Sequence, residues 1–110
     1  MLVIRWQGDA KPQLNELEQK MCQEGLSPFI WSSAPGDFYA VHSHKYEAIL
    51  YCAQGSICFS LPDKVDEYGN CLTISLNAGD GLILPPGTRH SARVGCVGVI
   101  CLEASRVLVK

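Results

Sequence analysis

Short runs of alternating apolar and polar residues, separated by turn-forming residues, dominate the chain from Phe29 onward. Alternation with a period of two is typical of half-buried β-strands. Turn signals stand between the runs, as in A-P-G-D at 34–37 and P-P-G at 85–87. The runs predict strands over residues 28–33, 37–43, 47–53, 56–61, 71–76, 81–84, 89–94 and 97–104. Many short strands at this spacing predict an all-β sandwich or barrel.

The N-terminal segment has a different pattern. Residues 2–6 predict a short strand, and residues 9–24 have the apolar spacing of an amphipathic helix. The apolar stripe consists of Leu14, Leu17 and Met21. Asp9 is a suitable N-cap, Pro12 suits the first turn, where no amide donor is needed, and Gly25 can end the helix. We expect this helix to pack against the outside of the barrel and to carry no chemistry.

The length of 110 residues suits one domain with one core. We expect a single domain over residues 1–110, in which residues 1–30 form the N-terminal strand and helix and residues 31–110 form the barrel. The charged segment K-V-D-E-Y-G-N at 64–70 predicts an exposed hairpin loop.

Composition narrows the function classes. The net charge is −2, and the sequence has no basic cluster that would suit nucleic acid or an anionic membrane. No apolar run approaches the ~20 residues needed to cross a bilayer, and the N-terminus lacks a signal-peptide pattern, so we expect a cytoplasmic protein. The six cysteines are then expected to be reduced structural thiols, because several lie in apolar strand-like runs.

All three histidines stand in two short segments. The first reads G-D-F-Y-A-V-H-S-H-K-Y-E-A-I-L-Y-C-A-Q-G from Gly36 to Gly55, and the second reads G-D-G-L-I-L-P-P-G-T-R-H from Gly79 to His90. An H-x-H pair on a strand directs both rings to the same face. A third imidazole from a distant strand would complete a three-nitrogen metal site.

These two segments resemble the paired motifs of the cupin superfamily, and together with the residues between them they cover about half of the chain. The matching positions are Gly36, His42, His44, Gly55, Gly79, Pro85, Gly87 and His90. The resemblance implies a double-stranded β-helix (jelly-roll) barrel with a metal held by His42, His44 and His90. Two positions depart from the family pattern: the final Asn of the second motif falls on Val94, and the glutamate of the first falls on Ala48, one place after Glu47.

Strand parity suggests that the family's glutamate is missing from the interior. If Gln54 and Gly55 form a two-residue hairpin turn, one face of the hairpin is wholly apolar and should line the cavity. That face carries Ala48, Leu50, Cys52, Ile57, Phe59 and Leu61. Glu47 would then point outward, although a slip of one residue or a bulge would turn it inward as a fourth ligand.

Three imidazoles leave coordination positions free for a substrate, dioxygen or an activated water. The expected metal is one divalent transition ion, Fe, Mn, Ni or Zn. Some cupin-type dioxygenases hold iron with three histidines and no glutamate, and the chain resembles them in ligand count. Tyr46, two residues past His44, is a candidate to donate a hydrogen bond to a group on the metal.

Two functions of different class remain open. The first is a small metal-dependent enzyme, oxygenase-like, acting on a small molecule. The second is a non-catalytic module that binds a small molecule or a metal, because the fold hosts both. We also expect a homodimer, because the outward apolar stripe of Ile49, Tyr51 and Ala53 needs a cover.

Overall fold

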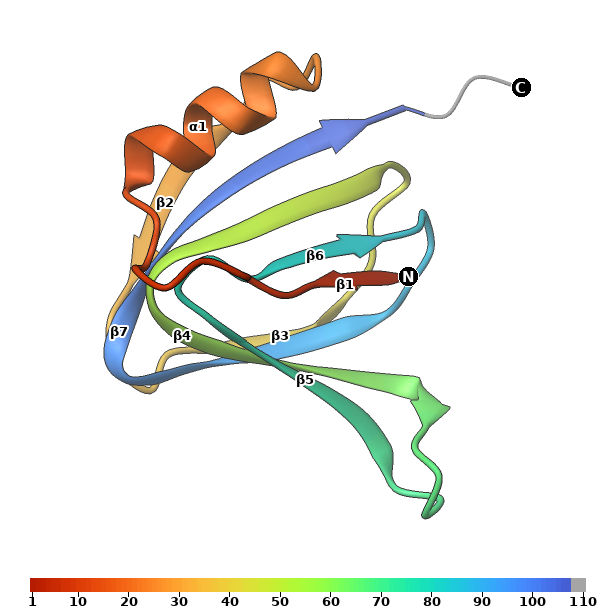
Figure 1. The fold of residues 1–110 in the computed structure, drawn as a ribbon. Helices are drawn as coiled ribbons and strands as arrows, with labels where there is room; N and C mark the ends of the chain where they lie inside the picture. The colour runs from red at the N-terminus through yellow and green to blue at the C-terminus, as the bar shows by residue number, and fades with distance from the viewer. Residues whose placement is uncertain (108–110) are drawn as a thin grey trace.

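The computed structural model describes residues 1–107, and these form an antiparallel β structure with one helix (Figure 1). The strands are β1 (Leu2–Ile4), β2 (Phe29–Ser33), β3 (Phe38–His42), β4 (Glu47–Val65), β5 (Cys71–Asn77), β6 (Gly81–Leu84) and β7 (His90–Arg106), and the helix is α1 (Leu14–Gln23). The all-β jelly-roll prediction is confirmed. Among the described residues, no helix is long and apolar enough to cross a membrane.

Two long strands, β4 and β7, pair with each other and bend together, so that each takes part in both halves of the barrel (Figure 1). The first half of β4 pairs with β6 and with the end of β7, and β1 and β2 complete that layer. The second half of β4 pairs with β5 and with the start of β7, and β3 completes the other layer. The cavity lies between these layers.

The hairpin predicted at Gln54-Gly55 is wrong, because the chain bends there within a single strand. The predicted strands 47–53 and 56–61 are one strand that pairs with β7 and does not fold back on itself. Gly55 has a φ of 80° and Gly98, across the ladder, a φ of 83°. A side chain at Gly55 would collide with the backbone carbonyl of Gly98, so these glycines let the two strands turn the corner together. In the same way, the predicted strands 89–94 and 97–104 are both parts of β7.

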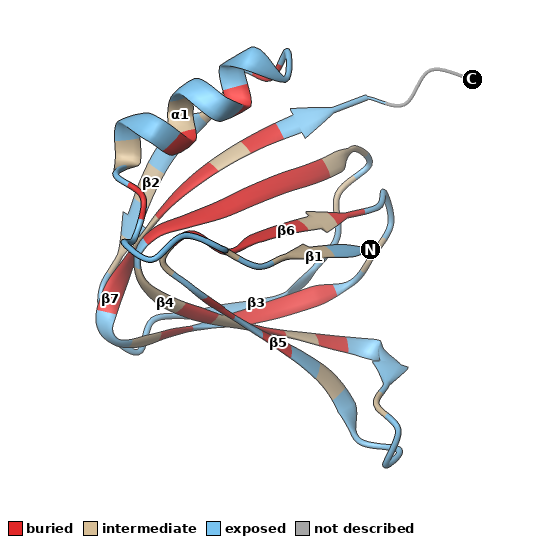
Figure 2. Ribbon diagram, viewed as in Figure 1, coloured by how far each residue is buried: buried red, intermediate tan, exposed pale blue. Residues whose placement is uncertain are grey.

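The parity prediction nevertheless holds, because the register shifts around the bend keep the apolar side chains of both halves inward. One buried cluster fills the barrel and includes Ala48, Leu50, Cys52, Ile57, Phe59 and Leu61. A second buried cluster lies on the outer face and includes Ile49, Tyr51, Ala53, Leu102 and Ala104. Buried residues therefore alternate between two cores along the first half of β4, which is buried almost continuously (Figure 2).

Helix α1 covers that outer face, and Leu17 and Met21 are buried against it. The helix begins later than predicted, since Gln13 and not Asp9 is the N-cap. Pro12 precedes the helix and restrains residue 11 from helical geometry. The Gln13 backbone amide donates to Glu16 Oε1 at 3.3 Å, as in a capping box. Gly25, with a φ of 82°, ends the helix as expected.

The packing of α1 removes the basis of the dimer prediction. Ile49 and Tyr51 are each 2% exposed, because the helix of the same chain covers them. Charged substitutions there would disrupt the second core and would not test a subunit interface. All six cysteines are free, and Cys52 and Cys101 are fully buried side by side across the β4–β7 ladder.

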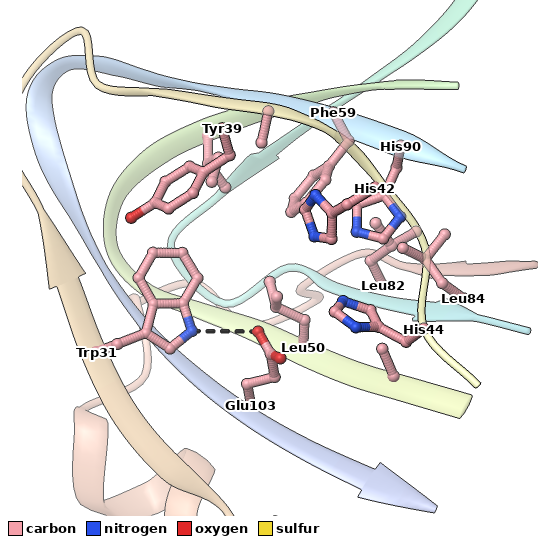
Figure 3. Close-up of a pocket in the computed structure, with 13 residues that line it drawn as sticks. Trp31, Tyr39, His42, His44, Leu50, Phe59, Leu82, Leu84, His90 and Glu103 are labelled. Carbon is pink, nitrogen blue, oxygen red and sulfur yellow. Dashed lines mark hydrogen bonds between the residues drawn. The ribbon is translucent and has the colours of Figure 1, made fainter. Parts of the chain in front are cut away.

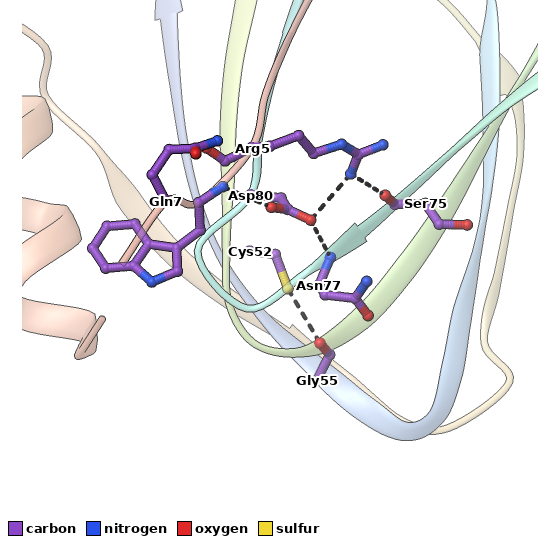
Figure 4. Close-up of polar contacts among 8 residues, drawn as sticks. Arg5, Gln7, Cys52, Gly55, Ser75, Asn77 and Asp80 are labelled. Atoms are coloured by element: carbon purple, nitrogen blue, oxygen red, sulfur yellow. Dashed lines mark hydrogen bonds and ion pairs between the residues drawn. The ribbon is translucent and has the colours of Figure 1, made fainter. Parts of the chain in front are cut away.

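Asp80 joins the N-terminal segment to the barrel (Figure 4). Its carboxylate accepts hydrogen bonds from the backbone amides of Trp6 and Asn77, both at 3.0 Å, and from Arg5 Nη1 at 3.0 Å. Through the bond from Asn77, three residues earlier, Asp80 caps its own turn. Arg5 also donates to the Ser75 carbonyl at 2.6 Å, so this carboxylate connects residues that are distant in the sequence.

Candidate metal and ligand site

Three imidazoles meet at one end of the cavity. His42 ends β3 and His90 begins β7, where the two are paired across the ladder, and His44 follows two residues after β3. The ring centroids are 4.3 Å apart for His42 and His90, 4.9 Å for His42 and His44, and 5.4 Å for His44 and His90. The Gly87 amide donates to the His44 carbonyl at 2.8 Å, so the P-P-G loop holds the segment that carries His44.

The donor set fits a divalent transition metal. One ligand nitrogen from each of the three histidines lies within 4.8 Å of the others. His42 Nδ1 lies 2.8 Å from the Ala40 carbonyl oxygen, and His90 Nδ1 lies 2.9 Å from that of Thr88. A carbonyl can only accept, so each Nδ1 carries the proton and each Nε2 keeps its lone pair. Such outer hydrogen bonds fix the tautomer and orientation of histidine ligands in metal sites.

Burial and crowding favour the neutral form of His44 and His90 by lowering the pKa of each. Burial, followed by the nearby His42, lowers the pKa of His44. The pKa of His90 is also lowered: burial is the main cause, the hydrogen bond to Thr88 opposes it, and His42 and His44 add to it. A neutral imidazole is the form that binds a metal, so the lowered pKa values of His44 and His90 favour metal binding.

Glu47 does not join the histidines. Its carboxylate Oε1 lies 3.2 Å from Arg106 Nη1, in an ion pair on the outer face. Within residues 1–107, the potential metal-ligand group holds only the three histidines. Ala48, at the position of the family's glutamate, is 5% exposed and lines the cavity beside them.

The cavity has a volume of about 170 Å³ and continues inward from the histidines (Figure 3). Its walls are mainly apolar, and aromatic and acidic side chains lie at the end away from the histidines. The lining residues are Trp31, Tyr39, His42, His44, Ala48, Leu50, Ile57, Phe59, Leu82, Leu84, His90, Ala92 and Glu103.

Three residues expected at the pocket lie elsewhere. Cys52 sits deeper in the core, beyond the cavity, where it faces Cys101. Leu61 lies farther along β4, past the cavity, and is 1% exposed. Tyr46 is not among the lining residues: its ring stacks on His44, with ring centroids 4.8 Å apart at 18°, and packs against the barrel core. This contact holds Tyr46 beside the His44 imidazole.

The sequence interpretation missed Glu103 and the partner that holds it. Glu103 lies on β7 and accepts a hydrogen bond from Trp31 Nε1 of β2 at 3.2 Å (Figure 3). One signal was available in the sequence: in V-I-C-L-E-A-S, Glu103 is two residues after Cys101, so it shares that residue's inward face. A carboxylate at an inward strand position among apolar residues is costly unless it is bound.

Comparison with known proteins connects this geometry to a family. Residues 29–96 match the family model described as the AraC-like ligand binding domain. An acireductone dioxygenase of Puccinia graminis f. sp. tritici is 28% identical over 97 residues, which are 80% of this chain and 52% of that protein. Acireductone dioxygenase 4 of Arabidopsis thaliana is 39% identical over 70 residues, 64% of this chain and 35% of that protein. The chain thus spans about half, or less, of the length of these curated relatives.

Among solved structures, an oxalate decarboxylase of Bacillus subtilis superposes with a TM-score of 0.62 and 26% identity, over 74% of this chain and 21% of that one. The similarity covers most of the present barrel and a small part of the larger enzyme. The barrel fold is therefore shared with this enzyme.

Proposed function

Because the chain belongs to the family of AraC-like ligand-binding domains, within the cupin superfamily, we propose that it is a metal-dependent oxygenase acting on a small molecule. His42, His44 and His90 would hold one divalent transition metal. The observation that carries this proposal is the convergence of three oriented imidazoles at the mouth of an apolar cavity.

The residues around the site have separable roles in this proposal. The carbonyls of Ala40 and Thr88 hold the protons of His42 and His90 on Nδ1. A bound divalent metal supplies Lewis-acid chemistry and, if it is redox-active, electron transfer at the coordination positions that three histidines leave free. Leu50, Phe59 and the other apolar walls exclude water and confine a ligand beside the histidines.

The size of the cavity limits the substrate to a small molecule. A volume of about 170 Å³ suits a compound of a few carbon atoms and excludes a polymer. Since two curated relatives are acireductone dioxygenases, an acireductone or a similar enediol is the first substrate to test. Iron and nickel are the first metals to test, with manganese and zinc as further candidates.

A second function is supported by the family match itself, whose name describes ligand binding. The same barrel would then bind a small molecule, with or without a metal, and would not transform it. Both functions place the ligand in the same cavity, so only turnover distinguishes them.

The test combines metal analysis with oxygen uptake. We expect the purified protein to bind close to one Fe(II) per chain under anaerobic loading, and each of His42→Ala, His44→Ala and His90→Ala to lower that affinity at least tenfold. The iron-loaded protein should then consume dioxygen when an acireductone is added, as measured with an oxygen electrode. Metal-dependent binding of the acireductone without uptake would favour the binding module. Failure to bind any of the four metals would refute both the site and the enzyme.

We also propose that residues 1–110 act as one cytoplasmic domain and that the protein forms a homodimer. Exposed apolar side chains on β2 and β3, rather than the covered face of β4, support an interface. They are Phe29, Ile30, Phe38 and Val41, each more than 40% exposed. Sedimentation of the purified protein at micromolar concentration tests the dimer.

A further inference from the structure

Glu103 is the acidic side chain on the wall of the cavity, and it occupies a position where strand parity calls for an apolar residue. Its neighbours on β7 are Leu102 and Ala104, which face the outer core under α1. Cys101, two residues earlier, faces the barrel core. Glu103 therefore points into the barrel and lies across the ladder from Leu50. A carboxyl group in such surroundings loses hydration that a single hydrogen bond does not restore.

Only half of this carboxyl group is used by the fold. Trp31 Nε1 donates to Oε1 at 3.2 Å, and Trp31 is itself held edge-on by Tyr39, with centroids 5.8 Å apart. The Tyr39 hydroxyl is in turn engaged with the Ser33 hydroxyl. Among residues 1–107, no hydrogen bond to Oε2 is present and no fully buried side-chain oxygen or nitrogen is left unpaired, so Oε2 is not sealed inside the core, and Glu103 itself lines the cavity.

The cavity consequently has two polar ends. The three imidazoles form one end, Glu103 with Trp31 forms the other, and the walls between them are apolar (Figure 3). Glu103 is not a ligand of the same metal position, because the group of mutually close ligand atoms in residues 1–107 contains no carboxylate. Burial raises the pKa of Glu103, and this is partly offset by the hydrogen bond from Trp31 and by the nearby His90 and His42.

We propose that Glu103 is the specificity-determining residue of the cavity: its Oε2 accepts a hydrogen bond from a hydroxyl or ammonium group on the end of the ligand that lies away from the three histidines. The ligand class is then a small two-ended molecule, with an oxygen anion for the metal and a hydrogen-bond donor at the far end. This inference rests on the proposed binding of a small molecule beside the histidines. It adds which second group that molecule must carry.

The test uses the zinc-loaded protein and isosteric carboxylates of four to six carbons that end in a hydroxyl, an ammonium or a methyl group, such as 5-hydroxypentanoate, 5-aminopentanoate and hexanoate. Their dissociation constants are measured by isothermal titration calorimetry. In the unmodified chain, the donor-ended probes should bind about tenfold more tightly than the methyl-ended probe of equal size, as expected for a hydrogen bond to a charged group.

Substitutions then separate the role of Glu103 in recognition from its role in packing. Glu103→Leu should remove the preference for both donors. Glu103→Gln keeps an acceptor for Trp31 but offers an amide donor, so it should lose the ammonium preference and keep binding the hydroxyl probe, which can also accept. Glu67→Gln, the same change at an exposed position in the turn between β4 and β5, should alter nothing.

The two proposals fail in different ways. If zinc is bound but the probes show no donor preference, bind too weakly to measure, or keep their preference in Glu103→Leu, the role of Glu103 is overturned while the metal site stands. If zinc does not bind, or if probe affinity is the same in His90→Ala, the proposed metal-dependent binding fails, and the two-ended ligand fails with it. Metal content of the Glu103 variants should equal that of the unmodified protein.

Discussion

Asp80, which is buried, and Glu103, which is half-buried, are two carboxylates of the same small barrel that differ in how many hydrogen bonds the fold gives them. The Asp80 carboxylate accepts hydrogen bonds from two backbone amides and one guanidinium, so both of its oxygens are bonded within the fold. The Glu103 carboxyl group lines the cavity and accepts one hydrogen bond, from the Trp31 indole, to one of its two oxygens. For Asp80, burial alone would raise the pKa, but the bonds from Trp6, Asn77 and Arg5 outweigh it and lower the pKa. For Glu103, burial prevails and raises the pKa.

The difference shows how a buried acid can be structural or functional according to its partners. A carboxylate with all of its hydrogen bonds made inside the fold stabilises the ion and the fold together. A carboxylate with unused capacity costs stability and is retained where a ligand can use it. Both carboxylates stand near strand ends, so position alone does not separate them; the number of donors does.

The largest expected effect is on the structural carboxylate. Asp80→Asn removes the charge and places an amide among three donors, so we expect the free energy of unfolding to fall by about 3 kcal/mol. Urea denaturation monitored by circular dichroism measures it. Asp63→Asn is the matched control, because Asp63 forms an exposed ion pair with Arg89 at 3.3 Å and should change stability by less than ~1 kcal/mol. Equal losses in both variants would contradict the structural role of Asp80.

The pH dependence of that loss has a defined sign. Because the pKa of Asp80 is lowered in the folded state, its contribution is fully present above the ordinary pKa of an aspartate and is lost as the pH falls through the lowered value. The difference between the unmodified protein and Asp80→Asn should therefore shrink toward acid and be constant at neutral pH.

An intermediate effect concerns the position that distinguishes this site from a four-ligand site. Ala48→Glu places a carboxylate on the inward face beside the histidines, and we expect it to tighten metal binding roughly tenfold, or about 1.4 kcal/mol. Competition with a chromophoric chelator measures the affinity. Glu47→Ala, on the outer face, should leave the affinity unchanged. Loss of metal in Glu47→Ala would show that Glu47 leaves Arg106 to act as the fourth ligand.

The sequence predicted more of the site than of the connections that build it. The three histidines were predicted because their spacing resembles a family motif. The inward face of β4 was predicted because apolar residues alternate with outward residues on both sides of the bend. The hairpin at Gln54-Gly55 was wrong because a glycine with positive φ suits a corner in a long strand as well as a turn. The packing of α1 over Ile49 and Tyr51 could not be predicted from the local pattern. An apolar stripe on a strand is covered equally well by a helix of the same chain or by another subunit.

The smallest expected effect is that of Glu103→Leu on the free energy of unfolding. Glu103→Leu removes one bond to Trp31 but also removes a poorly hydrated acid, so the free energy of unfolding should change by no more than about 1 kcal/mol, and at neutral pH it should rise. A carboxyl group whose pKa is raised by folding contributes stability below its ordinary pKa and loses that contribution as the pH rises through the folded value. The advantage of the variant should thus be greatest at neutral pH and shrink in acid, as followed by urea denaturation of the metal-free protein at several pH values. A loss as large as that of Asp80→Asn would mean that Glu103 holds the barrel together as Asp80 does, and that its free oxygen is not reserved for a ligand.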